Sequence, residues 1–394
     1  MLLTAPEVVI TWQDGEPVAD NFLLRRCMDI NKDTLLVLHH CSAPVTHEEL
    51  LKELKVGGFE IGEDELAEAV AELLEADLLV NVEEPVSTGV VDRNSSWSYW
   101  GTEAKYFHFA TKDAPYVVMA TSETVDYFDE MVSAPQPPLI KRYPAALRLP
   151  LPRVRTEISH RFTDVLLARR TVRDFKDQSI TVEQLSQLCD LAFAPQQFVN
   201  AEPFGALPLR TYANAGARSE LEVYVNAIDI RGVDPGLYHY NGIEHSLELL
   251  GGVLSREDMS YLSYDQAMCS AAPVSFFITA CVDRVGHKYR NPRALRAIYA
   301  DAGHLGQNFA LVATACGLGA WQTLAFRDTE IERLLNIDGI SETALYLLGA
   351  GMAATDKDHP AHIAISLAAS SRTNLYEDAA VDYGNLPDIR GVSA

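Results

Sequence analysis

A run of prolines near the middle of the chain most constrains how it can fold. The run lies within residues 133–152 and comprises Pro135, Pro137, Pro138, Pro144, Pro150 and Pro152. Proline lacks a backbone N–H and fixes φ, so no regular helix can pass through this stretch. We therefore predict an extended connector over residues 105–155 that lies on a protein surface. It separates a unit at 1–104 from a larger unit at 156–394.

The composition indicates a folded protein of more than one domain. Of the 394 residues, 48% are hydrophobic and 22% are charged, which is enough to build a core. The formal net charge of −23 opposes general binding to nucleic acids or to anionic membranes. The six cysteines form no C-x-x-C pair, which favours reduced thiols in a cytoplasmic protein. We see no signal-peptide pattern and no uninterrupted apolar stretch long enough to span a membrane.

Residues 1–104 are expected to form a winged-helix-like domain. The apolar stretch 33–40, the capping-box spacing of Thr46 and Glu49, and the amphipathic stretch 62–77 predict three short helices. Residues 77–83 predict a closing strand. The exposed face of the third helix is acidic, whereas a helix that reads DNA would be basic. This unit is therefore expected to be a structural or peptide-docking module.

The second half of the chain alternates between helical and strand patterns. Helices are predicted from Thr156 to 170, from Thr181 with Gln184 at the capping-box position, and over 299–316, ending at Gly317 and Gly319. Strands are predicted at 221–228, 236–241, 274–282 and 344–351. We find no internal repeat and no low-complexity tract.

Three arginines and a threonine are concentrated where the first of these helices ends. Arg169, Arg170, Thr171 and Arg173 place three forked donors and a hydroxyl within five positions. Surface arginines are common at helix C-termini, so a purely structural role is one interpretation. The other is a phosphate site, because several guanidinium groups and a hydroxyl can hold a phosphate dianion at several oxygens.

This cluster and three later segments resemble the nitroreductase superfamily, in particular its SagB-type azoline dehydrogenases of peptide natural-product (RiPP) biosynthesis. The later segments are GLYHYNGIEHSLELL, HKYRNPRALR and DAGHLGQNFALVATACGLG, and the resemblance covers about Thr156 to Gly351. It implies an α+β fold with an antiparallel-dominated sheet wrapped by helices. It also implies flavin mononucleotide (FMN) as the cofactor, bound at the interface of a homodimer.

The resemblance assigns the cofactor site residue by residue. Arg169, Arg170, Thr171 and Arg173 would hold the FMN phosphate, and Gly319 would let backbone approach the flavin. Asn214 and Gly216 lie where the family has a Pro-Ser-Ala/Gly-Gly turn against the flavin ring. Ala213 and Asn214 replace the proline and the serine in this chain, whereas Gly216 is retained.

Lys288 and Tyr289 match the catalytic Lys-Tyr pair of the family, although Arg290 follows where the family usually has glycine. Oxidation of an azoline to an azole removes a proton and a hydride; flavin accepts the hydride, so a side chain must accept the proton. A neighbouring ammonium favours a phenolate and burial favours a neutral amine, so either residue could be the base. His304, Gln307 and Asn308 are expected to be supporting polar groups, and we predict no metal site.

The predicted function is therefore FMN-dependent oxidation of peptide-borne azolines, with electrons passing to oxygen. The expected partners are the precursor peptide, a second copy of the chain and a cyclodehydratase complex. Two alternatives are NAD(P)H-dependent reduction of nitro, quinone or enone compounds on the same fold, and an inactive peptide-binding scaffold subunit.

Overall fold

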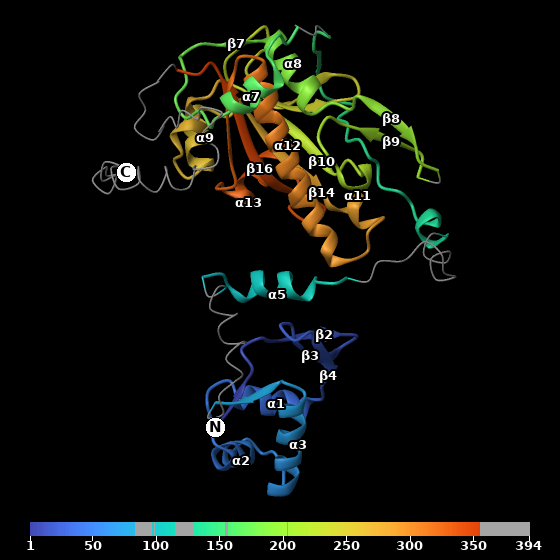
Figure 1. Cartoon of the computed structure of the whole chain (residues 1–394), viewed down its shortest axis with the longest axis vertical. Helices are drawn as coiled ribbons and strands as arrows, with labels where there is room; N and C mark the ends of the chain where they lie inside the picture. The colour runs from blue at the N-terminus through green and yellow to red at the C-terminus, as the bar shows by residue number, and fades with distance from the viewer. Residues whose placement is uncertain (83–96, 98, 115–128, 154–156, 203, 355–394) are drawn as a thin grey trace, which may run out of the picture.

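The computed structural model describes residues 1–82, 97, 99–114, 129–153, 157–202 and 204–354. Thr156, where the first helix of the second half was expected to begin, lies outside the described residues, as do parts of the connector and of the 156–394 unit. The described residues form an N-terminal unit and a larger unit built on one sheet (Figure 1).

The N-terminal unit contains the three expected helices and the expected strand. Its elements are β1 Leu2–Thr4, β2 Val8–Gln13, β3 Glu16–Asn21, β4 Arg26–Asp29, α1 Lys32–His40, α2 His47–Val56, α3 Glu63–Glu75 and β5 Leu79–Asn81. The capping box of Thr46 and Glu49 is present at the start of α2. The antiparallel strands β2–β3–β4 were not predicted, although Asp14–Gly15, both with positive φ, is a hairpin signal that could have revealed them.

Helix α5, Thr102–Ala110, was not predicted and contacts both units. The Phe22 ring of the N-terminal unit stacks with Phe109 and meets Tyr106 edge-on. On the other side, the Arg296 guanidinium donates to the His108 carbonyl at 2.5 Å. The predicted boundary at residue 104 falls inside this helix, and the domain boundaries remain predictions.

The larger unit contains the expected strands and two of the three expected helices in full. Its elements are β6 Arg148–Pro150, α7 Phe162–Ala168, β7 Ile180–Thr181, α8 Val182–Ala192, β8 Gln197–Asn200, β9 Ala206–Leu209, η1 Ala215–Ala217, β10 Leu221–Ala227, β11 Ile230–Arg231, β12 Gly236–Asn241, β13 Ser246–Gly251, α9 Arg256–Leu262, α10 Ala267–Ala271, β14 Val274–Cys281, α11 Val282–Gly286, η2 Pro292–Ala294, α12 Leu295–Ala315, β15 Gly319–Thr323, α13 Asp328–Leu335 and β16 Glu342–Gly351.

The central sheet has seven strands in the order β15-β16-β14-β10-β12-β13-β6, and all of its pairings are antiparallel. Helices α8 and α12 cover one face, where Leu188 and Phe309 join Val225 and Phe276 in the main core. Alternation along β10 turns Glu222 and Tyr224 to the opposite face. The fold is therefore α+β with an antiparallel sheet wrapped by helices, as the sequence predicts.

The described end of the connector is extended and lies on that opposite face. The Pro138 carbonyl accepts a hydrogen bond from Arg284 Nε at 2.8 Å, and the Lys141 backbone N–H donates to Glu222 at 3.1 Å. The Lys141 ammonium donates to Glu342 at 2.5 Å and to the Tyr224 hydroxyl at 2.7 Å. The connector thus supplies hydrogen-bond partners to buried polar groups of the sheet, and buried polar groups require such partners.

Helix α7 is shorter than predicted. The helix was expected from Thr156, but residues 157–161 are not helical and α7 begins at Phe162. Val165 is buried, whereas Phe162 is 68% and Leu167 is 69% exposed. Helices are held mainly by packing of an apolar face, and a face with one buried residue supports only a short helix. None of the described helices is long and apolar enough to cross a bilayer.

Candidate functional site

The arginine cluster lies at the end of α7, against the first strand after α12. Arg169 caps α7 with an extended ψ of 118°, which turns the chain away from the helix. Thr171 then forms a parallel bridge with Ala320 of β15, and the Val172 N–H donates to the Ala320 carbonyl at 2.9 Å. A side chain on Gly319 would overlap Val172. Gly319 therefore lets β15 approach the segment that carries the arginines.

The cluster is positive, and no ion pair neutralises its charge within the described residues. Within the part of the chain that the structure describes, no ion pair involves Arg169, Arg170 or Arg173. Arg169 is half-buried, and Arg170 donates only to the Arg169 carbonyl, at 2.7 Å. Neighbouring guanidinium groups repel one another, so an anion that bridges them would be strongly favoured.

The Lys-Tyr pair follows α11 and is half-buried. The Tyr289 N–H donates to the Val285 carbonyl at 2.9 Å, which continues the turn of α11. The Lys288 ammonium lies 5.2 Å from the centre of the Phe204 ring and 5.3 Å from that of the Tyr289 ring. Both side chains therefore combine a fixed backbone with access to a ligand.

The structure brings the predicted turn and Tyr289 together. Gly216 has φ +60°, and Ala217 and Ser219 also have positive φ, at 52° and 57°. A Cβ atom on Gly216 would overlap the Tyr289 hydroxyl. Non-glycine residues in this region of φ are strained, and such strain is common at functional sites. The turn thus forms a surface against which the phenol is held.

Replacing Gly216 by alanine is expected to destabilise the protein by about 1–3 kcal/mol, because the new Cβ requires both a strained φ and displacement of Tyr289. Denaturant unfolding checks this value. The matched control is Gly252→Ala, which has open space around the added methyl. Equal stability of the two variants would show that the Gly216 contact with Tyr289 does not constrain the turn.

Two buried carboxyl groups, those of Glu220 and Asp301, accept hydrogen bonds from the turn that contains Gly216. Asn214 Nδ2 lies 3.0 and 2.9 Å from the two Glu220 oxygens and 3.1 Å from Asp301 Oδ2. The Ala215 N–H donates to Asp301 Oδ2 at 2.7 Å, and the Ser219 N–H donates to Asn214 Oδ1 at 3.0 Å. Asn214 is thus engaged inside the protein in this structure, and its predicted contact with the flavin ring stays a prediction.

Burial raises the pKa of Glu220 to about 7, and the neighbouring Asp301 carboxylate adds to the rise. Asn214 opposes it. In the unfolded chain Glu220 ionises near its ordinary pKa of ~4.3, so the folded state holds a proton that the unfolded state releases between these two values. Stability from this group is complete below the unfolded pKa and is lost as the pH rises through about 7.

Glu220→Gln, a neutral mimic of the protonated acid, is therefore expected to stabilise the protein at pH ~8 by on the order of 2 kcal/mol. This gain in stability should vanish near pH ~4, where the side chain at position 220 is neutral in the wild type as well as in the variant. Thermal unfolding of wild type and variant across this range checks the prediction. Glu257→Gln, at an exposed position of α9, should leave the pH dependence unchanged. A wild type as stable at pH ~8 as Glu220→Gln would contradict the raised pKa of Glu220.

The two predicted parts of the site lie at opposite ends of α12 within one chain. The arginine cluster lies near its C-terminal end beside β15, whereas Lys288 and Tyr289 precede its N-terminal end near α11 (Figure 1). The helix has 21 residues, or about 30 Å at the usual rise. A single chain therefore does not bring the arginines together with the Lys-Tyr pair.

Of the three polar residues of α12 expected to be supporting groups, Asn308 and His304 contact neighbouring elements, whereas Gln307 is exposed. Asn308 donates to the Thr211 hydroxyl at 2.9 Å, and His304 Nδ1 lies 3.2 Å from the Ala213 carbonyl. Asp301, the buried acid of this helix, was not singled out from the sequence because nothing in its spacing marks it. No metal-binding group of three or more His, Cys, Asp or Glu side chains occurs among the described residues.

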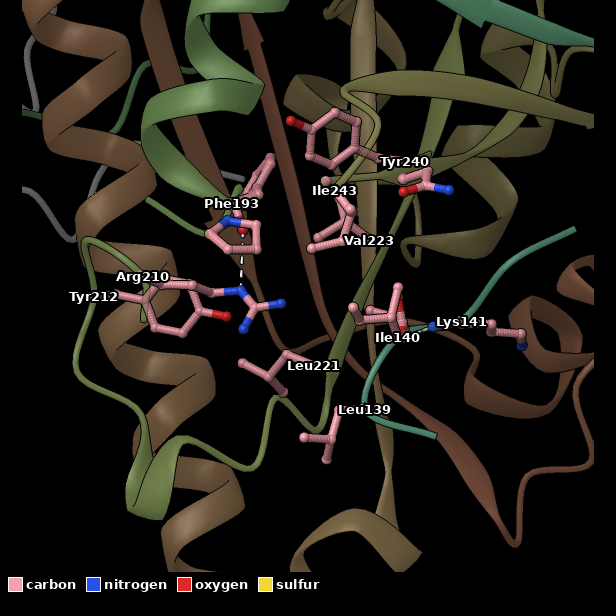
Figure 2. Close-up of a pocket in the computed structure, with 14 residues that line it drawn as sticks. Leu139, Ile140, Lys141, Phe193, Arg210, Tyr212, Leu221, Val223, Tyr240 and Ile243 are labelled. Atoms are coloured by element: carbon pink, nitrogen blue, oxygen red, sulfur yellow. Dashed lines mark hydrogen bonds between the residues drawn. The ribbon is translucent and has the colours of Figure 1, made fainter. Parts of the chain in front are cut away.

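A separate cavity lies between the connector and β10 (Figure 2). It has a volume of about 30 Å³ and is lined by Leu139, Ile140, Arg210 and Tyr212, among others. Arg210 Nε donates to the Phe193 carbonyl at 3.1 Å. A space of this size holds one or two water molecules and is too small for a cofactor or a peptide.

Comparison with known proteins identifies the class to which this fold and site belong. The model of the nitroreductase family matches residues 166–352. The nitroreductase MJ1384 of Methanocaldococcus jannaschii is 32% identical over 188 residues, which are 48% of this chain and 89% of that protein. The chain therefore belongs to the nitroreductase family, whose members typically bind FMN.

Two further relatives come from Rhizobium leguminosarum bv. trifolii. The trifolitoxin-processing protein TfxB is 29% identical over 170 residues, 42% of this chain and 46% of TfxB. The trifolitoxin operon protein TfxC is 23% identical over 377 residues, 89% of this chain and 100% of TfxC. Among solved structures, a nitroreductase-like protein of Anabaena variabilis has a TM-score of 0.47 and 22% identity over 62% of this chain and 49% of that one.

Proposed function

We propose that this protein is an FMN-dependent oxidoreductase that oxidises peptide-borne azolines to azoles. The observation that carries the proposal is the Tyr289 hydroxyl held against the positive-φ turn at Gly216, with the Lys288 ammonium beside the Tyr289 ring. A reaction that removes a proton and a hydride needs a positioned base, and this pair supplies one.

The described residues fit the cofactor. Arg169, Arg170, Thr171 and Arg173 would hold the FMN phosphate, because their positive charge has no acidic partner among the described residues. Gly319 would support this segment through its contact with Val172. When bound, FMN supplies a hydride acceptor that passes electrons on to oxygen.

The chain's own residues account for the remaining steps. The turn at Gly216 positions Tyr289, and the Lys288 ammonium lies 5.3 Å from the centre of the Tyr289 ring. The Phe204 ring lies beside Lys288, with its centre 5.2 Å from the ammonium. The proton leaving the azoline would be accepted by one member of this pair.

The peptide substrate and the assembly are further parts of the proposal. The similarity to TfxC extends over most of the chain, including the N-terminal unit, and TfxB is named for processing of trifolitoxin. We infer a precursor peptide as substrate, a homodimer in which the arginines of one chain approach the Lys-Tyr pair of the other, and association with a cyclodehydratase. The homodimer is supported by the separation of the two groups along α12.

The test begins with the absorption spectrum of the purified protein, followed by turnover with an azoline-containing peptide under oxygen. We expect a flavin spectrum and a peptide product two mass units lighter. Rapid reduction by NAD(P)H with no loss of mass from the peptide would instead support a reductase of nitro, quinone or enone compounds. Protein that stays colourless with added FMN would support an inactive scaffold.

A further inference from the structure

Arg218 is a fully buried guanidinium with unused donors. Its Nε donates to the Arg284 carbonyl at 2.8 Å. Nη1 and Nη2 are buried and have no hydrogen-bond partner among the described residues. Burial of a charge without a partner is strongly unfavourable, and buried arginines are normally paired. A bound ligand is therefore the candidate partner for Nη1 and Nη2 of Arg218.

Arg218 follows the Gly216 turn that packs against the Tyr289 hydroxyl, and its guanidinium and the Lys288 ammonium both lie near the Phe204 ring. Its Cζ is 5.9 Å from the centre of the Phe204 ring, and the Lys288 ammonium is 5.2 Å from the centre of the same ring. The acidic group that acts on Arg218 is Glu220, which forms no ion pair with it and is held instead by Asn214.

A second buried arginine shows that this fold does supply partners to such groups. Arg284 donates from Nη2 to Glu222 at 2.6 Å, from Nη1 to the Ser219 carbonyl at 2.6 Å and from Nε to the Pro138 carbonyl at 2.8 Å. All three nitrogens of Arg284 are used, whereas two of the three on Arg218 are not. The contrast marks Arg218 as the buried arginine whose two Nη atoms have no hydrogen-bond partner among the described residues.

The chemistry of the proposed reaction offers a fitting ligand, and the inference rests on that proposed function. The azoline proton to be removed is on C4, next to the amide carbonyl that continues the peptide. As the C4–H bond breaks, negative charge develops on that carbonyl oxygen. Donors aimed at such an oxygen inside a buried site stabilise the transition state strongly. The FMN phosphate, the other anion of the reaction, is assigned to the arginine cluster at the opposite end of α12.

We propose that Arg218 is a further catalytic residue, whose free N–H groups bind the amide carbonyl oxygen next to azoline C4. The C4 proton passes to the Lys288–Tyr289 pair, and the electrons of the C4–H bond are held in part on that oxygen. They then form the C4=C5 double bond as a hydride leaves C5 and is accepted by FMN. Two electrons and one proton thus leave with the hydride, and the second proton stays on the protein.

Exchange of the C4 proton with D₂O tests the role of Arg218 apart from turnover. The protein is used with its flavin reduced beforehand, so that exchange proceeds without oxidation, and exchange is followed by mass spectrometry. We expect Arg218→Met to slow exchange about 100-fold with unchanged flavin content. Arg218→Lys keeps the positive charge but lacks the forked guanidinium, so its exchange rate should lie between those of the wild type and Arg218→Met.

Thermal stability separates this role from a structural one. Removing an unpaired buried charge should leave Arg218→Met at least as stable as wild type, whereas the matched variant Arg284→Met strands Glu222 and should melt several degrees lower. Slow exchange in a fully stable Arg218→Met protein is the supporting result.

Three outcomes would overturn the proposal. Wild-type exchange in Arg218→Met would remove Arg218 from the reaction. Melting as low as that of Arg284→Met would assign it a structural role. Loss of flavin from Arg218→Met would place it in the cofactor site. A wild-type protein that exchanges no C4 proton, yet keeps the expected order of melting temperatures, would indicate instead that the proposed azoline substrate is wrong.

Discussion

Tyr289→Phe and Lys288→Ala are expected to lower turnover of an azoline peptide by about 10²–10⁴-fold with FMN retained, because each removes a group needed to accept the proton. The phenol is held against Gly216 and the ammonium lies 5.3 Å from the Tyr289 ring, so neither role passes readily to another residue. Steady-state kinetics with flavin content measured on the same samples checks the expectation.

Tyr299→Phe is the matched control for the loss of a phenol. Tyr299 lies on α12 and is 53% exposed, so it should keep full activity. If Tyr289→Phe and Lys288→Ala both turned over at the wild-type rate, the pair would have no part in the mechanism. The contact between Tyr289 and the Gly216 turn would then serve packing alone.

Replacing Arg169 and Arg173 together by glutamine is expected to weaken FMN binding by about 10²–10⁴-fold, at ~1.5–3 kcal/mol for each charged hydrogen bond lost. Folding should be unaffected, since neither side chain has an ion pair within the described residues. Fluorescence titration with FMN measures the affinity, and thermal unfolding without FMN measures the fold.

Salt dependence and a control variant sharpen this test. Charge-based binding of FMN should weaken as ionic strength rises, and less so in the double variant. Arg333→Gln, on the exposed face of α13, should bind FMN as wild type does. Full affinity in the Arg169/Arg173 variant would show that the phosphate is bound elsewhere on the protein.

The periodic elements of the second half could be predicted because burial imposes clear patterns on them. Strands β10, β12 and β14 are buried along their length, and Thr181 with Gln184 caps α8 as expected. Strand β4 of the N-terminal unit could not be predicted in the same way. β4 is exposed at every position and pairs only through its backbone, so no hydrophobic alternation marks it.

The site was predictable only in part. Gly216 and Tyr289 were both named from sequence resemblance, but their contact joins residues that are distant along the chain. Arg218, Glu220 and Asp301 were not named, because a buried charge looks like a surface charge until its surroundings are known. The separation of the arginine cluster from Lys288 along α12 was equally invisible in the sequence.

Local patterns of apolar and polar residues were enough to predict the core strands, the two capped helices and the cluster of three arginines, whereas the α+β class and the antiparallel order of the strands came from the family resemblance. Only the tertiary structure decided which charges are paired. Arg284 forms an ion pair with Glu222, whereas Arg218 forms none within the described residues. Pairing depends on distances across the fold, and local sequence carries no information about those distances.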